Sequence, residues 1–159
     1  ASAHQRRQAV RSVGFNSQSA PALCWRTGVG VMLSPEISEA LSGCDVEPCG
    51  SRVTCNPPPL DTDRDYLVVV PNDADAVRNV VMSLESNAFR WEGSEHYQDA
   101  AGEFMSWRRD DVNLIVTANQ SFAMRHRAAT AICKRLNLQN KSDRIAVFQA
   151  VLYGNSESV

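Results

Sequence analysis

The chain has 159 residues, of which 43% are hydrophobic and 21% are charged, and its formal net charge is -2 at pH 7. This length and composition are ordinary for one globular domain with a buried core. The slightly acidic balance excludes the overall basic field with which many nucleic-acid-binding proteins attract phosphate.

Targeting and cysteine patterns both favour a cytoplasmic protein. No apolar run approaches the ~20 residues of a transmembrane helix, and the N-terminal residues lack the apolar core of a signal peptide. The five cysteines form no Cys-x-x-Cys pair, although Cys44, Cys49 and Cys55 are close in sequence. Disulfide scaffolds are small and secreted, and zinc sites have closer pairs, so we expect reduced thiols that pack as small hydrophobes.

The first half of the chain predicts an N-terminal extension and then two strands. Residues 1–33 carry no persistent hydrophobic period and form either a loosely held arm or an irregular segment packed on the core. The domain proper is predicted at 34–154. Ser34 is a typical N-cap, with Pro35 at the first position of a helix that ends near Leu41. The predicted elements that follow are a strand at 46–49, a Gly-Ser turn at 50–51, a proline spacer at 57–59 and a strand at 65–70.

Predicted helices and strands also follow one another in the second half of the chain. Residues 71–87 have apolar side chains at helical spacing. The predicted elements that follow are short strands at 89–91 and 104–107 with a polar segment at 92–102 between them, a strand at 112–117, a helix at 120–136 and a last helix capped by Ser142. This order predicts an α/β (α+β) fold, with a small mixed β-sheet backed by helices and a helical C-terminal part at 119–154.

Two carboxylates mark the start of the second strand. Asp63 and Asp65 are one residue apart, so their side chains project from the same face. Such a pair repels unless a cation lies between its members, and Mg²⁺ takes carboxylate and phosphate oxygens as ligands. Gly50 and Ser51 offer backbone N–H groups and a hydroxyl to a phosphate. The segment therefore predicts a metal–nucleotide site; the alternative is a turn that caps an ordinary strand.

This arrangement resembles the signature of the DNA polymerase β-like nucleotidyltransferase superfamily, in which a Gly-Ser pair precedes Asp-x-Asp at the mouth of a strand. Residues 42–154 are similar to small nucleotidyltransferase-like proteins encoded by bacteriophages, which would place the chain in the host cytoplasm. The resemblance implies two Mg²⁺ ions, replaceable by Mn²⁺, held by Asp63 and Asp65. It also implies that Gly50 and Ser51 grip the triphosphate of an NTP substrate.

A third carboxylate decides whether such a site is catalytic, because two-metal transfer uses acids from different strands. The resemblance implies Asp111 for this role, as both a metal ligand and a catalytic residue. Strand alternation places Asn113 on the same face as Asp111, and Asp110 on the other face. The alternative is that both aspartates only terminate the loop before them.

The other polar residues predict less. Arg52 follows the Gly-Ser turn and either neutralises phosphate or lies exposed at a strand edge. Arg64 replaces the apolar residue usual between the two motif acids, and alternation turns it to the opposite face, where Asp61 and Asp45 are possible partners. The C-terminal helices carry basic residues that either line a triphosphate cleft or form a solvated surface: Arg125, His126, Arg127, Lys134, Arg135, Lys141 and Arg144.

Two functions remain open. The first is Mg²⁺-dependent transfer of an NMP group from an NTP to an acceptor hydroxyl, with release of pyrophosphate. The acceptor is RNA or another nucleic acid, a small molecule or a protein, such as a toxin partner. The second is a catalytically silent member of the fold that binds a nucleotide or a partner, with a regulatory or antitoxin-like role.

Overall fold

The structure is a computed structural model, and it describes residues 33–60, 62–92 and 102–154. All of them belong to one unit that spans Val31–Val159. The predicted N-terminal extension at 1–33 lies outside the described residues except for Leu33, and so does most of the polar segment at 92–102.

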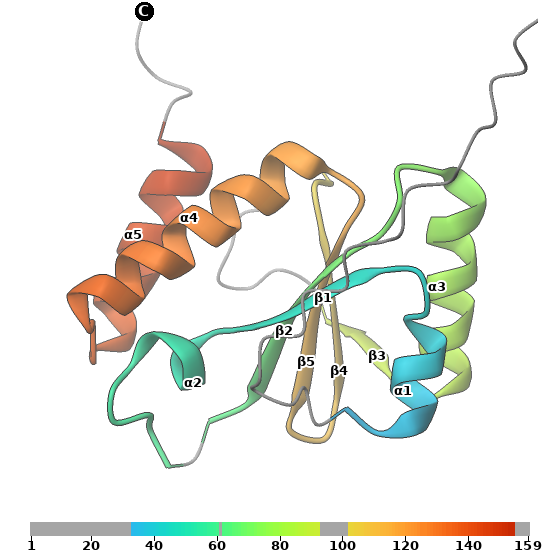
Figure 1. Cartoon of the computed structure of the whole chain (residues 1–159), viewed down its shortest axis with the longest axis horizontal. Coiled ribbons are helices and arrows are strands. Elements are labelled where there is room, and N and C mark those ends of the chain that lie inside the picture. The colour runs from blue at the N-terminus through green and yellow to red at the C-terminus, as the bar shows by residue number, and fades with distance from the viewer. Residues whose placement is uncertain (1–32, 61, 93–101, 155–159) are drawn as a thin grey trace, which may run out of the picture. The chain divides into compact units, whose positions relative to one another are not determined.

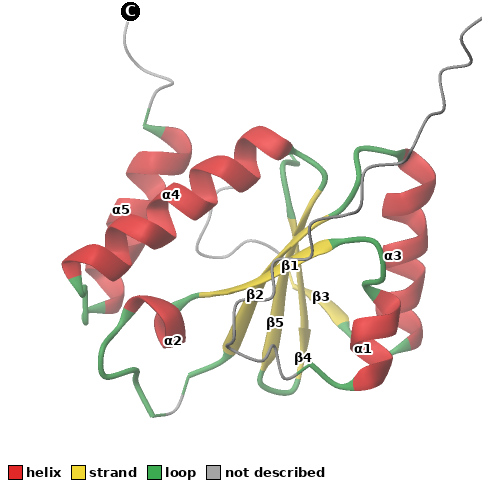
Figure 2. Cartoon of the chain, viewed as in Figure 1, coloured by secondary structure: helices red, strands yellow, loops and turns green. Residues whose placement is uncertain are grey.

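A mixed five-stranded sheet forms the centre of the unit, in the order β1-β2-β5-β4-β3 (Figures 1 and 2). The strands are β1 (Asp45–Cys49), β2 (Arg64–Val69), β3 (Arg90–Glu92), β4 (Met105–Arg109) and β5 (Val112–Thr117). Strands β2 and β5 are parallel, and the other neighbours are antiparallel. The predicted fold class, a small mixed sheet backed by helices, is confirmed.

Helices cover both faces of this sheet (Figure 1). One face packs against α1 (Pro35–Ala40) and α3 (Ala74–Ser86). The other packs against α4 (Gln120–Leu136) and α5 (Lys141–Tyr153), with the short α2 (Ser51–Thr54) beside α4. The sheet therefore separates two cores, and a residue's strand position decides which helices it meets.

The central strand β2 shows why the sheet needs both helical layers. Tyr66 and Val68 are buried under α1 and α3, whereas Leu67 and Val69 are buried under α4 and α5. A strand that is apolar on both faces is typical of the interior of an α/β sheet. Each such side chain contributes roughly 1.5–3 kcal/mol when it is fully buried.

Four cysteines occur in the described residues, and all are free thiols. Cys49, Cys55 and Cys133 are buried, whereas Cys44 is half-buried. Cys49 and Cys133 belong to the core under α4 and α5, which confirms the prediction that cysteines here pack as small hydrophobes. Cys24 lies outside the described residues.

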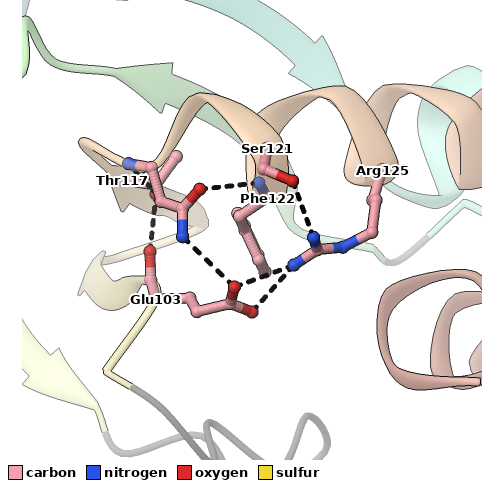
Figure 3. A network of polar contacts seen from close by, with 6 residues as sticks. Glu103, Thr117, Ser121, Phe122 and Arg125 are labelled. Carbon is pink, nitrogen blue, oxygen red and sulfur yellow. Dashed lines mark hydrogen bonds and ion pairs between the residues drawn. The ribbon is translucent and has the colours of Figure 1, made fainter. Parts of the chain in front are cut away.

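A polar network fixes the start of α4 at the end of β5 (Figure 3). The Asn119 side chain caps the helix by accepting a hydrogen bond from the Phe122 N–H, and its amide donates to the Glu103 carboxylate. Arg125 donates to both oxygens of that carboxylate at 2.8 and 3.0 Å, and the Thr117 hydroxyl donates to the Glu103 carbonyl. Arg125 therefore holds the fold together here instead of lining a triphosphate cleft.

The predicted elements agree closely with the structure except at two places. The Gly-Ser turn continues into α2, a helix that the sequence analysis did not predict. The last helix begins at Lys141 after Asn140, not after Ser142. Strand β5 has the bounds predicted for it, and Val112 pairs with Arg109, so Asp110 and Asp111 form a two-residue turn between β4 and β5.

Candidate functional site

A pocket of about 390 Å³ opens on the α4–α5 side of the sheet, next to the start of β2. Its lining residues are Gly50, Ser51 and Thr54 around α2; Thr62, Asp63 and Asp65 at β2; Arg108 and Asn113 from β4 and β5; and Lys141, Arg144, Ile145 and Phe148 from α5. Both carboxylates lie at the start of β2, and two of the three cationic side chains come from α5. The pocket thus has an acidic floor and a basic wall.

Gly50 forms the bend between β1 and α2, and its backbone explains why glycine occupies this position. Its φ of 68° and ψ of -164° lie in a region that only glycine adopts readily. A side chain on Gly50 would overlap the carboxylate of Asp65. The bend therefore lies directly against one of the two predicted acids, and Ser51 begins α2 at the edge of the pocket.

Asp65 is held by its neighbour on the parallel strand. The amide Nδ2 of Asn113 donates to Asp65 Oδ1 at 2.8 Å, and the Ser106 hydroxyl donates to Asn113 Oδ1 at 3.1 Å. Ser106 thereby orients the amide so that its donor faces the carboxylate. Burial raises the pKa of Asp65 above its ordinary value, although the bond from Asn113 acts in the opposite direction.

Asp63 forms an ion pair with Arg108, whose Nη2 lies 2.9 Å from Asp63 Oδ2. The Nε atom of the same guanidinium lies 2.9 Å from Glu92 Oε2. Arg108 pairs with Asn113 in the β4–β5 register, and Asn113 pairs with Asp65 in the β2–β5 register. Asp65, Asn113 and Arg108 therefore lie in one row across the same face of the sheet.

The structure brings together four of the predicted site residues, Gly50, Ser51, Asp63 and Asp65. It does not bring Asp111 to them. Both carboxylate oxygens of Asp111 accept hydrogen bonds from Arg64, at 2.7 and 2.8 Å. Arg64 pairs with Val112, which is buried under α1 and α3, so this ion pair belongs to the opposite face. The expected position of Asp111 was therefore wrong, because strand alternation does not extend into the turn that precedes Val112.

Arg52 is exposed, as one of its two predicted alternatives has it, although it lies in α2 and not at a strand edge. Its guanidinium donates to the carbonyl oxygen of Thr62 at 2.6 and 2.9 Å, and it is not part of the pocket lining. Arg52 therefore steadies the backbone that leads into Asp63. Of the two partners suggested for Arg64, Asp45 pairs with Arg127 instead, and Asp61 lies outside the described residues.

The basic wall of the pocket was only partly visible in the sequence. Lys141, Arg144, Ile145 and Phe148 recur at the spacing of one helix face, which is the signal that groups them. Arg144 Nη1 donates to the carbonyls of Leu138 and Gln139 at 2.9 and 2.6 Å, and it lies 3.2 Å from Cys55 Sγ. These contacts fix one edge of the guanidinium at the pocket wall.

Two asparagines connect the proline loop to the turn between α4 and α5. The Asn56 N–H donates to Asn137 Oδ1 at 2.7 Å, and Asn137 Nδ2 donates back to the Asn56 carbonyl at 3.0 Å. Asn137 has a φ of 48°, the left-handed conformation common at a helix end. The loop before Asp63 and the turn before Lys141 are thus bonded to each other.

Comparison of the sequence with models of known protein families and with curated proteins finds no match to either. The geometry of the pocket alone therefore carries the functional argument. In the part of the chain that the structure describes, no helix is both long enough and apolar enough to span a bilayer.

The carboxylates of this pocket suit one hard cation. Among the described residues, no group of three or more His, Cys, Asp and Glu side chains is arranged to hold a metal ion. Asp63 and Asp65 nonetheless line one pocket, and Mg²⁺ is often bound by one or two carboxylates together with substrate phosphates. The residues present therefore fit a metal that arrives with a phosphate ligand, whereas the position beside Asp65 that a third acid would need is held by Asn113.

Proposed function

We propose that this pocket binds a nucleoside triphosphate together with a divalent cation, Mg²⁺ or Mn²⁺, and that the domain is a nucleotide-binding protein. The single observation that carries the proposal is the division of the pocket into an acidic floor and a basic wall. Asp63 and Asp65 lie on one side, and Lys141 and Arg144 lie on the other. A ligand that carries both a cation and several phosphate charges complements both sides.

The basic wall is suited to the phosphates. Lys141 is exposed and can turn toward a ligand, whereas Arg144 is fixed by its bonds to backbone carbonyls. Charged hydrogen bonds to phosphate are shorter and stronger than neutral ones. Ser51 adds a hydroxyl at the bend, and Ile145 supplies apolar lining next to these charges.

The acidic floor is suited to the cation. Bound there, Mg²⁺ would neutralise part of the phosphate charge that would otherwise repel Asp63 and Asp65. The raised pKa of Asp65 shows that its charge is costly in this environment without a cation. The amide of Asn113 keeps one Asp65 oxygen oriented, which positions the carboxylate for its ligand.

Binding without transfer is favoured by the residue beside Asp65. In the two-metal mechanism a further acid helps to hold the ion that activates the attacking hydroxyl. Asn113 occupies that position, and Asp111 is bonded to Arg64 on the other face. Nucleotidyl transfer to an acceptor hydroxyl is the second candidate, and the shared pocket of Asp63 and Asp65 with the Gly50–Ser51 bend favours it.

Isothermal titration of ATP in the presence of Mg²⁺ tests the proposal. Wild-type protein should bind, and Lys141→Gln should weaken binding by roughly tenfold because one charge-assisted phosphate contact is lost. Lys134→Gln is the matched control, since Lys134 is exposed on α4 and outside the pocket lining. Equal affinity of the two variants, or no binding by wild type, contradicts the proposal. A pyrophosphate-release assay on the same samples separates binding from transfer.

A further inference from the structure

Arg108 occupies the place beside Asp63 where a cation is expected. Its guanidinium lies in the pocket lining and contacts Asp63 on one side and Glu92 on the other, both at 2.9 Å. The strand register sets this position, because Arg108 lies in the same row as Asn113 and Asp65. No pattern in the sequence predicts a role for Arg108.

We infer that Arg108 is the counter-cation of the site before a ligand binds. Its guanidinium competes with the divalent ion for Asp63 and moves its hydrogen bonds to the phosphates when a nucleotide enters. The inference rests on the proposed function and adds that binding of the metal depends on binding of the nucleotide. Metal and nucleotide then bind cooperatively, and the metal alone binds weakly.

Electrostatics gives the reason for this coupling. A guanidinium and a divalent ion at the same carboxylate repel each other, so a bare ion must displace Arg108 before it can use Asp63. An incoming triphosphate offers Arg108 another anionic acceptor and removes this obstacle. Guanidinium groups suit the exchange because they bind carboxylate and phosphate oxygens with the same fork of donors.

The neighbouring residue shows that the arrangement is specific to one position. Arg109 follows Arg108 in β4 and therefore points to the other face of the sheet. Its Nη1 donates to the carbonyl of Asn87 at 2.9 Å, and its guanidinium lies 5.0 Å from the centre of the Phe89 ring. Arg109 has the same charge and is adjacent in sequence, but neither of these two partners lines the pocket.

Binding of Mn²⁺ alone, measured by electron paramagnetic resonance of the free ion, tests the competition. Arg108→Gln should bind Mn²⁺ roughly tenfold more tightly than wild type, within the range usual for coupled sites. Arg109→Gln loses the same charge and should match wild type within a factor of about two, because it does not contact Asp63. Unchanged or weaker Mn²⁺ binding by Arg108→Gln overturns the inference.

ATP binding in the presence of EDTA tests whether Arg108 contacts the phosphates. Without metal, Arg108→Gln should bind ATP roughly tenfold more weakly than wild type, because a phosphate contact is missing. Arg108→Lys retains a charge without the planar fork, and it should lie between the two in both assays. This milder variant also replaces Arg108→Gln if the latter does not fold.

The two proposals fail in different ways. If wild type binds no ATP under any condition while Arg108→Gln still gains Mn²⁺ affinity, the competition is upheld and the nucleotide function is wrong. If wild type binds Mg²⁺-ATP while Arg108→Gln equals wild type in both assays, the nucleotide function is upheld and the inference about Arg108 is wrong.

Discussion

Two arginine–aspartate pairs flank the same end of the sheet, one on each face. Arg64 and Asp111 form the pair on the face that packs against α1 and α3, and their side chains are 33% and 50% exposed. Arg108 and Asp63 form the pair in the pocket, and theirs are 36% and 40% exposed. Exposure and chemistry are thus nearly the same, and the difference lies in how the charges are shared.

Arg64 meets both oxygens of one carboxylate, so the charges of this pair balance. Arg108 divides its donors between Asp63 and Glu92, and Asp65 lies in the same row. Arg108 therefore pairs with two carboxylates at once, and a third lies in the same row. The comparison teaches that a balanced pair closes a turn, whereas an excess of negative charge around one arginine leaves room for a second cation.

The largest expected effect comes from removing one acid on each face. Asp65→Asn should weaken binding of Mg²⁺-ATP by roughly 100-fold, because loss of a metal contact usually costs at least as much as loss of an outer partner. Asp111→Asn should change the same affinity by less than about twofold, since its charge is screened from the pocket. Calorimetric titration of both variants measures the contrast, and similar losses in both would erase the distinction between the faces.

The second effect concerns the bend at Gly50, which lies against Asp65 in the pocket. Gly50→Ala should lower the free energy of unfolding by at least about 1–3 kcal/mol, the usual cost of forcing a side chain into a conformation that glycine favours. Overlap with Asp65 adds to this cost. Gly43→Ala is the control, because Gly43 also has a positive φ, 86°, but no atom lies near its missing side chain. Urea denaturation should show the larger loss for Gly50→Ala.

The third effect follows from adding an acid to the pocket. Asn113→Asp replaces the amide that donates to Asp65 by a carboxylate, which would give the pocket three acids. We expect Mn²⁺ affinity to rise roughly tenfold, because a cation now relieves the repulsion among like charges. The protein without metal should be less stable than wild type for the same reason. Mn²⁺ titration followed by thermal melting checks both halves, and a variant that gains no affinity argues against a cation at this floor.

The smallest effect is the pH dependence of stability, which should have opposite signs on the two faces. The pKa of Asp65 is raised in the folded state, so its contribution to stability is lost as the pH rises above the unfolded value of 3.8. The bond from Arg64 lowers the pKa of Asp111, so its contribution is lost as the pH falls below 3.8. The contribution of Asp111 should be within about 1 kcal/mol, because it comes from an exposed ion pair.

Unfolding free energies measured between acidic and neutral pH check these signs. Relative to wild type, Asp65→Asn should gain stability as the pH rises toward neutral, and Asp111→Asn should lose it. A common sign for both variants contradicts the different environments assigned to the two carboxylates.

Much of the fold could be predicted because local patterns determine it. The apolar spacing of Val77, Val80 and Leu84 identifies α3, and continuous apolar runs identify β2 and β5. The proximity of Gly50 to Asp65 was also predictable, because the Gly-Ser turn and the two aspartates lie in one short segment of the sequence. The structure confirms that these residues meet in one pocket.

The rest of the site depends on contacts between distant segments. Whether Asp111 points to the pocket is decided by the turn at 110–111, where Asp110 has a φ of 53° and the alternation of β5 has not yet begun. Arg108 reaches Asp63 only through the register of three strands. A single sequence contains neither fact, because neither turn conformation nor register follows from local spacing alone.

The amide bridge between Asn56 and Asn137 has a mechanical consequence for the pocket. It joins the segment entering β2 to the turn between the two C-terminal helices. These two reciprocal bonds therefore help to fix the distance between the carboxylates of the sheet and the cations of α5, together with the contacts of Cys55 to Leu138 and Arg144. A substitution there would widen or narrow the opening without changing any group that touches a ligand.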